Sequence, residues 1–508
     1  MKSKQINELK KRLLEISYLA SISRLLNWDQ EINLPAKGAD YRAASISELS
    51  AILHTKLLNL DTDNLLTKLK KEVDGQKIKG QGAIIVNETW RSFDRERKLP
   101  EAFVRELAEV SSKAQTVWIE ARKKNDFLMF LPWLTKIVKL KRKEAKYVGY
   151  NFSPYDALID QYEPDMTTAK AEKILNDLKD FLVPFLKQIK ESKQKINSKV
   201  LIGNFPIEKQ ILFNKKVLAK LGFDFEAGRL DTSVHPFADS LHPHDVRITS
   251  RYSLNDIFYS VSSTIHEAGH ALYEQGLLAE HFGTPLAEPI SLGIHESQSR
   301  FWENMIGKSL PFWKHLYPSL KKDFPDAFKK LSLDDFYKAI NKVEPSLIRT
   351  ESDEVTYNLH IILRFEIEKG MIEGTINLKD LPKIWNAKMK EYFGIEVPTD
   401  SLGILQDVHW SGGGIGYFPT YSLGNLYSAQ FYEAMKKDIP DLSKKVSKGD
   451  FIVIREWLRK NIHVSGKTYT AESLVKKITG ENLDSKYFTD YLIEKYTKIY
   501  NLKRDSNI

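Results

Sequence analysis

The sequence contains no cysteine among its 508 residues. Disulfide bonds and thiolate metal ligands are therefore excluded, and any bound metal has to use histidine, aspartate or glutamate. Because a protein without disulfides suits a reducing compartment, we expect a cytoplasmic location. The chain also lacks any run of about 18 apolar residues, so no membrane-spanning helix is expected. Residues 1–12 mix charges throughout and have no apolar core of the kind found in a signal peptide.

Basic residues are in excess, but they are not concentrated in one place. The 76 basic and 67 acidic residues give a net charge of +9. The lysines form separate clusters, such as residues 68–71 and 187–195. A nucleic-acid-binding protein would need them on one surface, usually with aromatic residues between them. We therefore predict solvated helix faces, and neither nucleic acid nor membrane as a partner.

Apolar residues recur at helical spacing through almost the whole chain. The expected helices cover about residues 3–28, 40–74, 81–97, 100–126, 130–149 and 169–195. Long strands are scarce, and the best candidates, near residues 228–233 and 245–252, predict a small β element near residues 228–252. Since no repeat, linker or change in composition marks a boundary, we predict a mainly α fold with one domain over residues 1–508. Its first 200 residues would form a wall or lid over a catalytic half, residues 201–508.

The segment His266-Glu267-Ala268-Gly269-His270 carries the strongest chemical signal. Two histidines four residues apart on a helix point to the same side and can hold one metal ion, and Glu267 can then take a proton from water. Gly276 is a stop signal for this helix, and Gly269 inside it predicts that another segment packs closely there. The expected buried stripe consists of Val261, Ile265, Ala268 and Leu272.

A catalytic zinc ion needs a third protein ligand. Glu296 is the best candidate, because the helix expected to begin near Pro289 buries other positions and leaves Glu296 free to face the first helix. The expected buried positions are Ile290, Ile294, Phe301 and Met305. Spacing alone leaves other candidates open, namely Glu274, Glu280, Glu288, Glu303 and His295.

Two further stretches contain arginines that hydrolysis could use. Residues 244–249, around Arg247, form either part of a site or an ion-pair network at a strand end. Residues 348–354 are expected to begin a helix. On that helix Arg349, Asp353, Thr356, His360 and Arg364 would share one face. Helical phase alone favours a solvated face for them.

A third stretch, residues 406–414, joins His409 to a run of glycines that precedes Tyr417 and Tyr421. The glycines allow tight or mobile backbone, and the histidine and tyrosines are donors that could stabilise an oxyanion. The alternative is an ordinary turn followed by two core tyrosines.

Together these stretches resemble the carboxypeptidase Taq family of zinc metallocarboxypeptidases. The resemblance spans most of the chain. It is carried by residues 26–30, 155–158, 228–231, 235–237, 245–249, 266–270, 295–298, 348–354 and 403–410. Two departures are visible: Ser352 replaces an alanine, and Asn33-Leu34-Pro35 replaces a methionine-rich turn.

The resemblance implies a helical body with a deep, neurolysin-like groove and one zinc ion, which cobalt can replace. The implied ligands are His266, His270 and Glu296, and Glu267 is the implied general base. His409 and Tyr421 best match the histidine and tyrosine that face the scissile carbonyl, with Tyr417 in reserve. Family members release single C-terminal residues with broad specificity and are typically cytosolic homodimers.

We therefore predict a zinc-dependent metallocarboxypeptidase acting on peptides. Such an enzyme must bind a free carboxylate, for which a guanidinium is well shaped. Arg349 is the first choice and Arg247 the second. The alternatives are an oligoendopeptidase on the same scaffold, and a non-catalytic peptide-binding protein, against which the complete set of site residues argues.

Overall fold

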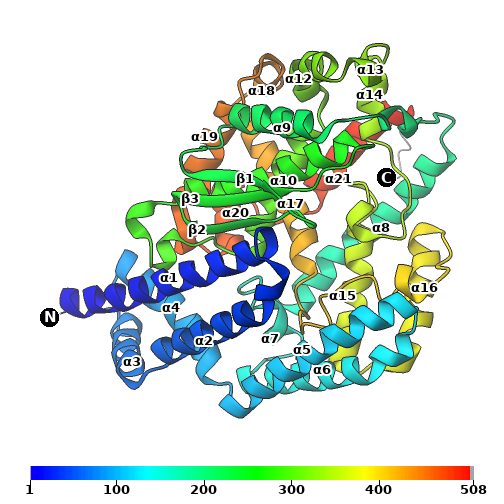
Figure 1. Ribbon diagram of the computed structural model, residues 1–508. Coiled ribbons are helices and arrows are strands. Elements are labelled where there is room, and N and C mark those ends of the chain that lie inside the picture. Colours follow the sequence, from blue (N-terminus) through cyan, green and yellow to red (C-terminus); the bar gives the residue numbers. More distant parts are fainter. Residues whose placement is uncertain (1, 504–508) are drawn as a thin grey trace.

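The computed structural model describes residues 2–503, and most of this range is helical (Figure 1). The helices are α1 (Lys2–Ile32), α2 (Ala39–Leu57), α3 (Leu60–Asp74), α4 (Gln81–Arg97), α5 (Glu101–Lys124), α6 (Phe127–Val148), α7 (Asp156–Ile159), α8 (Thr168–Glu191), α9 (Ile207–Leu221), α10 (Ile257–Gly276), α11 (Leu292–Arg300), α12 (Leu310–Asp323), α13 (Pro325–Phe328), α14 (Leu333–Ile340), α15 (Tyr357–Glu373), α16 (Leu381–Phe393), α17 (Pro419–Asp438), α18 (Leu442–Lys448), α19 (Ile452–Asn461), α20 (Ala471–Thr479) and α21 (Lys486–Tyr500). The strands are β1 (Gly228–Thr232), β2 (Ala238–His242) and β3 (Asp245–Ser250). The predicted mainly α fold with a small β element is confirmed. Within residues 2–503, no helix is long and apolar enough to span a bilayer.

The elements differ from the predicted ones in a few places. The helix expected over residues 40–74 is two helices, because Asn59 interrupts it and its side chain accepts a hydrogen bond from the Thr62 N–H at 2.7 Å. Strand β2 was not predicted; it is short and carries polar residues at half-buried positions. Residues 349–351 form a 3₁₀ turn, and α15 begins only at residue 357.

The sheet has the order β1-β3-β2, with β1 parallel and β2 antiparallel to the central strand β3. Val246 and Ile248 of β3 are buried among residues of α10. Helix α1 lies along β2 (Figure 1), where the Ser21 hydroxyl donates to the Leu241 carbonyl at 2.6 Å. The sheet therefore places α10 on one side and α1 at its edge.

Two large apolar cores lie on either side of α17. One contains residues of α5, α6, α8, α15, α16 and α21, and the other contains residues of α9, α10, α11, α12 and β3. Helix α17 contributes to both, with Leu426 in the first core and Leu423 in the second. This helix therefore fixes the position of α15 relative to α10.

Candidate active site

Helices α10 and α11 run antiparallel and approach each other closely. Along α10, His266 contacts Glu303, His270 contacts Glu296, and Glu274 contacts His295. The residue numbers rise on α10 while those of the partners fall, as expected for antiparallel segments. A Cβ atom at Gly269 would lie 2.4 Å from the Gln298 carbonyl oxygen. The predicted close approach at Gly269 is thus confirmed, as are the end of the helix at Gly276 and both predicted buried stripes.

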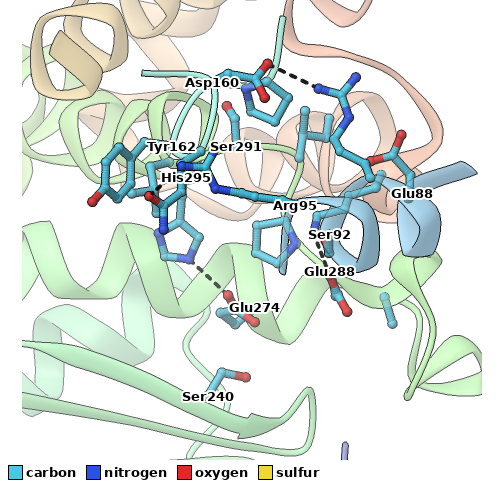
Figure 2. Close-up of a pocket in the computed structure, with 18 of the residues that line it drawn as sticks. Glu88, Ser92, Arg95, Asp160, Tyr162, Ser240, Glu274, Glu288, Ser291 and His295 are labelled. Carbon is cyan, nitrogen blue, oxygen red and sulfur yellow. Dashed lines mark hydrogen bonds and ion pairs between the residues drawn. The ribbon is translucent and has the colours of Figure 1, made fainter. Parts of the chain in front are cut away.

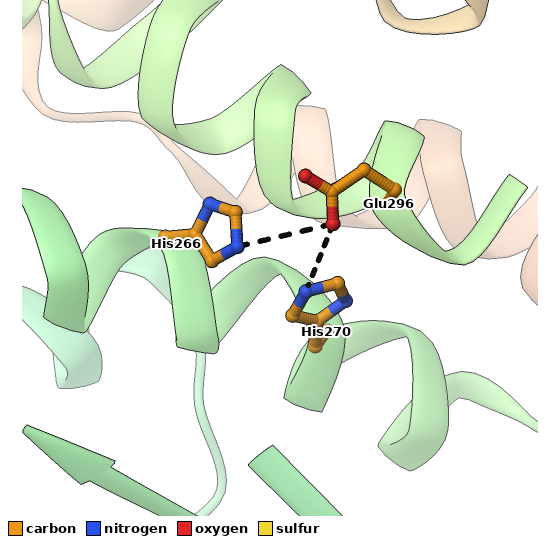
Figure 3. Close-up of side chains that lie close together, drawn as sticks. All are labelled: His266, His270 and Glu296. Atoms are coloured by element: carbon orange, nitrogen blue, oxygen red, sulfur yellow. Dashed lines mark ion pairs between the residues drawn. The ribbon is translucent and has the colours of Figure 1, made fainter. Parts of the chain in front are cut away.

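The two histidines and Glu296 converge (Figure 3). The Oε2 atom of Glu296 lies 3.5 Å from Nε2 of His270 and 3.9 Å from Nε2 of His266. One ligand atom from each residue falls within a span of 4.8 Å, the only such group of three or more metal-binding side chains among the described residues. Two imidazoles and one carboxylate suit a catalytic zinc ion, since three protein ligands leave a position for water.

The electrostatics of these residues fit the same use. Burial, with His295 and His266 adding to it, lowers the pKa of His270 well below its ordinary value. Its imidazole is therefore neutral, which is the form that binds a metal. Burial also raises the pKa of the Glu267 carboxyl group to about 7. A carboxylate with that pKa can exchange a proton with water near neutral pH.

The other candidates for the third ligand have different contacts. Glu274 binds Nε2 of His295 at 2.9 Å, and Glu303 accepts from Nδ1 of His266 at 2.9 Å. Glu288 pairs with Lys467 at 2.6 Å, and Glu280 is exposed. Of the five glutamates, only Glu296 faces both Nε2 atoms.

A cleft of about 500 Å³ extends from the first two residues of the motif, His266 and Glu267. Arg349, Tyr357 and Tyr421 also line it. Tyr421 comes from the first turn of α17, and burial raises its pKa well above the ordinary value, so it keeps its proton as a donor. Arg247 is not among the described residues that line this cleft; it pairs with Asp245 at 2.8 Å, as the ion-pair interpretation of that strand predicted.

Arg349 is held firmly and is only 6% exposed. Its Nε donates to Asp407 at 3.2 Å, and its Nη1 donates to the Tyr357 hydroxyl at 3.0 Å. Asp407 also accepts from Nε of the fully buried Arg364 at 2.7 Å. The solvated face expected for this segment is therefore wrong, because a 3₁₀ turn and buried ion pairs replace the regular exposed helix. Nη2 of Arg349 also lies 3.2 Å from Oδ1 of Asp407, so Nη1 and Nη2 each have one N–H beyond those directed at Tyr357 and Asp407.

His409 and Tyr417 lie beside Tyr421, with ring centroids 6.5 Å and 5.4 Å from that of Tyr421. Burial, with Arg349 and Arg364 adding to it and Asp407 opposing, lowers the pKa of His409 to about 4. The imidazole is therefore neutral at physiological pH. Of the three residues, only Tyr421 lines the cleft next to Glu267.

A second cleft, of about 880 Å³, is lined by Glu274 and His295 (Figure 2). His295 also stacks on His270 with ring centroids 4.5 Å apart. Residues 238–242, the whole of strand β2, also line this cleft, opposite charged side chains such as Glu88 and Arg95.

The comparisons with known proteins agree with this geometry. Residues 8–496 match the family described as carboxypeptidase Taq (M32) metallopeptidase. The chain belongs to this family. It is 40% identical over 494 residues to carboxypeptidase 1 of Bacillus subtilis, covering 96% of this chain and 97% of that protein. It is 39% identical over 496 residues to thermostable carboxypeptidase 1 of Thermus thermophilus, with the same coverage.

Among solved structures, the M32 carboxypeptidase of Deinococcus radiodurans superposes with a TM-score of 0.95 at 36% identity. The match covers 98% of this chain and all of the other one. The predicted family, the peptide-hydrolase activity and the metallocarboxypeptidase function are confirmed, and family membership implies a divalent metal ion.

Sequence patterns did not identify the residues that hold this site in place. Asp407, Arg364 and Glu368 are separated in sequence from the groups that they contact. Asp407 lies two residues before His409 in the candidate stretch 406–414, but nothing in the sequence indicates that it pairs with two arginines. The sequence predicts Glu303 only as a possible metal ligand, although a helix over residues 296–303 would place Glu303 and Glu296 on one face.

Proposed function

We propose that this metallocarboxypeptidase holds one zinc ion per chain with His266, His270 and Glu296, and that cobalt can replace zinc. The observation that carries the proposal is the convergence of the three ligand atoms within 4.8 Å. When bound, a zinc ion polarises the scissile carbonyl group and lowers the pKa of water. The neutral state of His270 and the buried position of Glu296 support this ligand set.

The proposed general base is Glu267. Its carboxylate takes a proton from the attacking water and then gives that proton to the nitrogen of the departing amino acid. Tyr421 donates its hydroxyl hydrogen to the carbonyl oxygen as negative charge develops there. His409 is proposed to help as a second donor, and Tyr417 is a proposed substrate-binding residue, in reserve for the role of Tyr421.

Arg349 is the proposed partner of the substrate's C-terminal carboxylate, with Arg247 as the second choice. Its location in the same cleft as Glu267, and the free N–H groups on Nη1 and Nη2, support the first choice. A guanidinium can bind a carboxylate through two parallel hydrogen bonds. The distance between Arg349 and the metal would then select the last peptide bond, so that single residues are released with broad specificity.

The remaining peptide would lie in the second cleft, along strand β2, under the wall or lid formed by residues 1–200. The proximity of this cleft to His270 through His295 supports that direction. The resemblance to family members further supports a cytoplasmic homodimer, and the absence of cysteine is compatible with that location.

A matched pair of peptides tests the proposal. A peptide with a free C-terminus and its C-terminally amidated form are incubated with dialysed protein and with protein reloaded with zinc or cobalt, and products are identified by mass spectrometry. Loss of single C-terminal residues from the free acid alone, and only with metal, is expected. Internal cleavage of both peptides would instead indicate an oligoendopeptidase.

A further inference from the structure

Glu303 lies next to the metal-binding group but is not part of it. It is the seventh residue after Glu296, in the π-helical segment Phe301–Gly307 that continues α11. Glu296 contacts His270, and Glu303 contacts His266, so both carboxylates face α10. π-Helical segments are rare and are found frequently at functional sites.

The contacts of Glu303 define its state. Its Oε2 accepts from Nδ1 of His266 at 2.9 Å and from Nη1 of Arg300 at 3.2 Å, and its Oε1 accepts from the Ser262 hydroxyl at 3.0 Å. The Lys308 ammonium lies 3.6 Å from Oε1. Because each of these four partners is a hydrogen-bond donor or a cation, the carboxylate accepts from all of them, and Nδ1 of His266 carries the proton.

Arg300 connects this carboxylate with the proposed metal ligand Glu296. Its Nε donates to Oε1 of Glu296 at 2.7 Å, so Oε2 is the oxygen left facing the two histidines. The guanidinium also lies 4.3 Å from the ring centre of Tyr357, whose hydroxyl accepts from Arg349. Arg300 lies one turn after Glu296. Because it is a cation, it cannot accept a hydrogen bond from His266, and Glu303, in the following turn, is the acceptor.

We infer that Glu303 is a positioning residue of the metal centre: it fixes the His266 ring so that unprotonated Nε2 faces the metal, while Arg300 holds both Glu303 and Glu296 in register. A histidine whose second ring nitrogen donates to a carboxylate is oriented and made more basic as a ligand. The inference rests on the proposed ligand set and adds to it the group that sets the tautomer of one ligand.

The chain offers a matched control. Glu274 makes a contact of the same length, 2.9 Å, to Nε2 of His295, and both glutamates are largely buried. His295 is not one of the proposed ligands. The substitutions Glu303→Gln and Glu274→Gln therefore make the same chemical change at two carboxylate–histidine pairs, only one of which involves a ligand.

The test measures zinc and cobalt affinity of the metal-free proteins by competition with a chromophoric chelator, together with the visible spectrum of the cobalt form. Glu303→Gln is expected to weaken metal binding by roughly 10–100-fold and to change the cobalt spectrum, whereas Glu274→Gln leaves both unchanged. Glu303→Asp keeps the charge but shortens the reach to Nδ1, so it should also bind more weakly. The thermal unfolding midpoint of each metal-free variant shows whether it is folded.

Two results would overturn the inference: wild-type affinity in both folded Glu303 variants, or equal weakening in Glu274→Gln. If Glu303→Gln does not fold, Glu303→Asp decides. A wild-type protein that binds no metal would instead refute the proposed metal centre, and the inference with it.

Discussion

The metal end of the cleft, with His266, His270 and Glu296, is built on helices, whereas the anchor end, with Arg349 and Asp407, is built on a 3₁₀ turn and a loop. At the metal end, each side chain is placed by helix geometry and by the close approach of α10 and α11 at Gly269. At the anchor end, buried ion pairs between segments that are distant in sequence hold the side chains in place. Substitutions at the first end should therefore affect metal binding and chemistry, and those at the second should affect stability and substrate recognition.

The two ends also differ in how their charges are arranged. At the metal end, neutral His270 and largely buried Glu296 leave ligand atoms facing a shared position. At the anchor end, Asp407 would have a raised pKa from burial alone, but Arg364 and Arg349 hold the pKa of this carboxyl group well below its usual range. The Asp407 carboxylate is thus shared between two guanidinium groups, so Arg349 still has donors that could bind a second carboxylate.

The largest effect is expected at the metal end. Glu296→Ala should lose both the metal and the activity, because two histidines alone make a poor zinc site. Metal content after dialysis is the measurement. Glu274→Ala and Glu288→Ala, whose side chains contact His295 and Lys467, should keep the metal. Full metal occupancy in Glu296→Ala would move the third ligand elsewhere.

Glu267→Gln should separate chemistry from metal binding. The amide has nearly the same shape but cannot accept a proton, so kcat is expected to fall by about 10²–10⁴-fold while the metal stays bound. Single-turnover kinetics and metal analysis of the same preparation check this. Wild-type kcat at full metal occupancy would exclude Glu267 as the general base.

At the anchor end, Asp407→Ala should destabilise the protein by about 3–5 kcal/mol, because it leaves two buried guanidinium groups without a counterion. The control is Asp245→Ala, which removes the partner of the less buried Arg247 and should cost about 1 kcal/mol or less. Urea unfolding midpoints compare the two. Equal shifts would mean that the buried pairs are not what holds the anchor end together.

Glu368 holds the loop that carries His409. Its carboxylate accepts from the Tyr155 hydroxyl at 2.7 Å, the Trp410 indole N–H at 2.7 Å and the Gly416 N–H at 3.0 Å. Glu368→Met keeps a side chain of similar length but removes both acceptor oxygens, so three buried donors lose their partner and a loss of about 1–3 kcal/mol in unfolding free energy is expected.

The effect of Glu368→Met should depend on pH. Burial raises the pKa of Glu368 from 4.5 to about 7 in the folded protein. The stability that comes from this raised pKa is fully present below the unfolded value and is lost as the pH rises through about 7. The difference in unfolding free energy between wild type and variant should therefore shrink from about pH 5 to about pH 8. A difference that grows with pH would contradict the raised pKa.

The contrast between the two ends also explains what could be predicted from the sequence. Local residue spacing can be observed directly in a sequence. It predicts helix α10, its buried stripe and the position of Glu296. The ion pair of Arg349 cannot be predicted in this way, because its partner Asp407 lies 58 residues further along the chain and also binds Arg364. The helical phase drawn through residues 349–364 failed for the same reason: a 3₁₀ turn and Asp353, which accepts from the Thr356 N–H at 3.0 Å, break the helix before α15.

The proposed release of single C-terminal residues depends most on Arg349 binding the substrate's C-terminal carboxylate, and one comparison of kcat/KM values tests this contact directly. Matched free-acid and amidated peptides are assayed with Arg349→Ala, Arg349→Lys and Arg247→Ala. Arg349→Ala should cost about 2–4 kcal/mol in transition-state stabilisation for the acid and almost nothing for the amide. Arg349→Lys should restore only part of it, since an ammonium cannot form two parallel hydrogen bonds. If Arg247→Ala instead abolishes the preference for the acid while Arg349→Ala keeps it, Arg247 binds the substrate carboxylate and the role proposed for Arg349 is wrong.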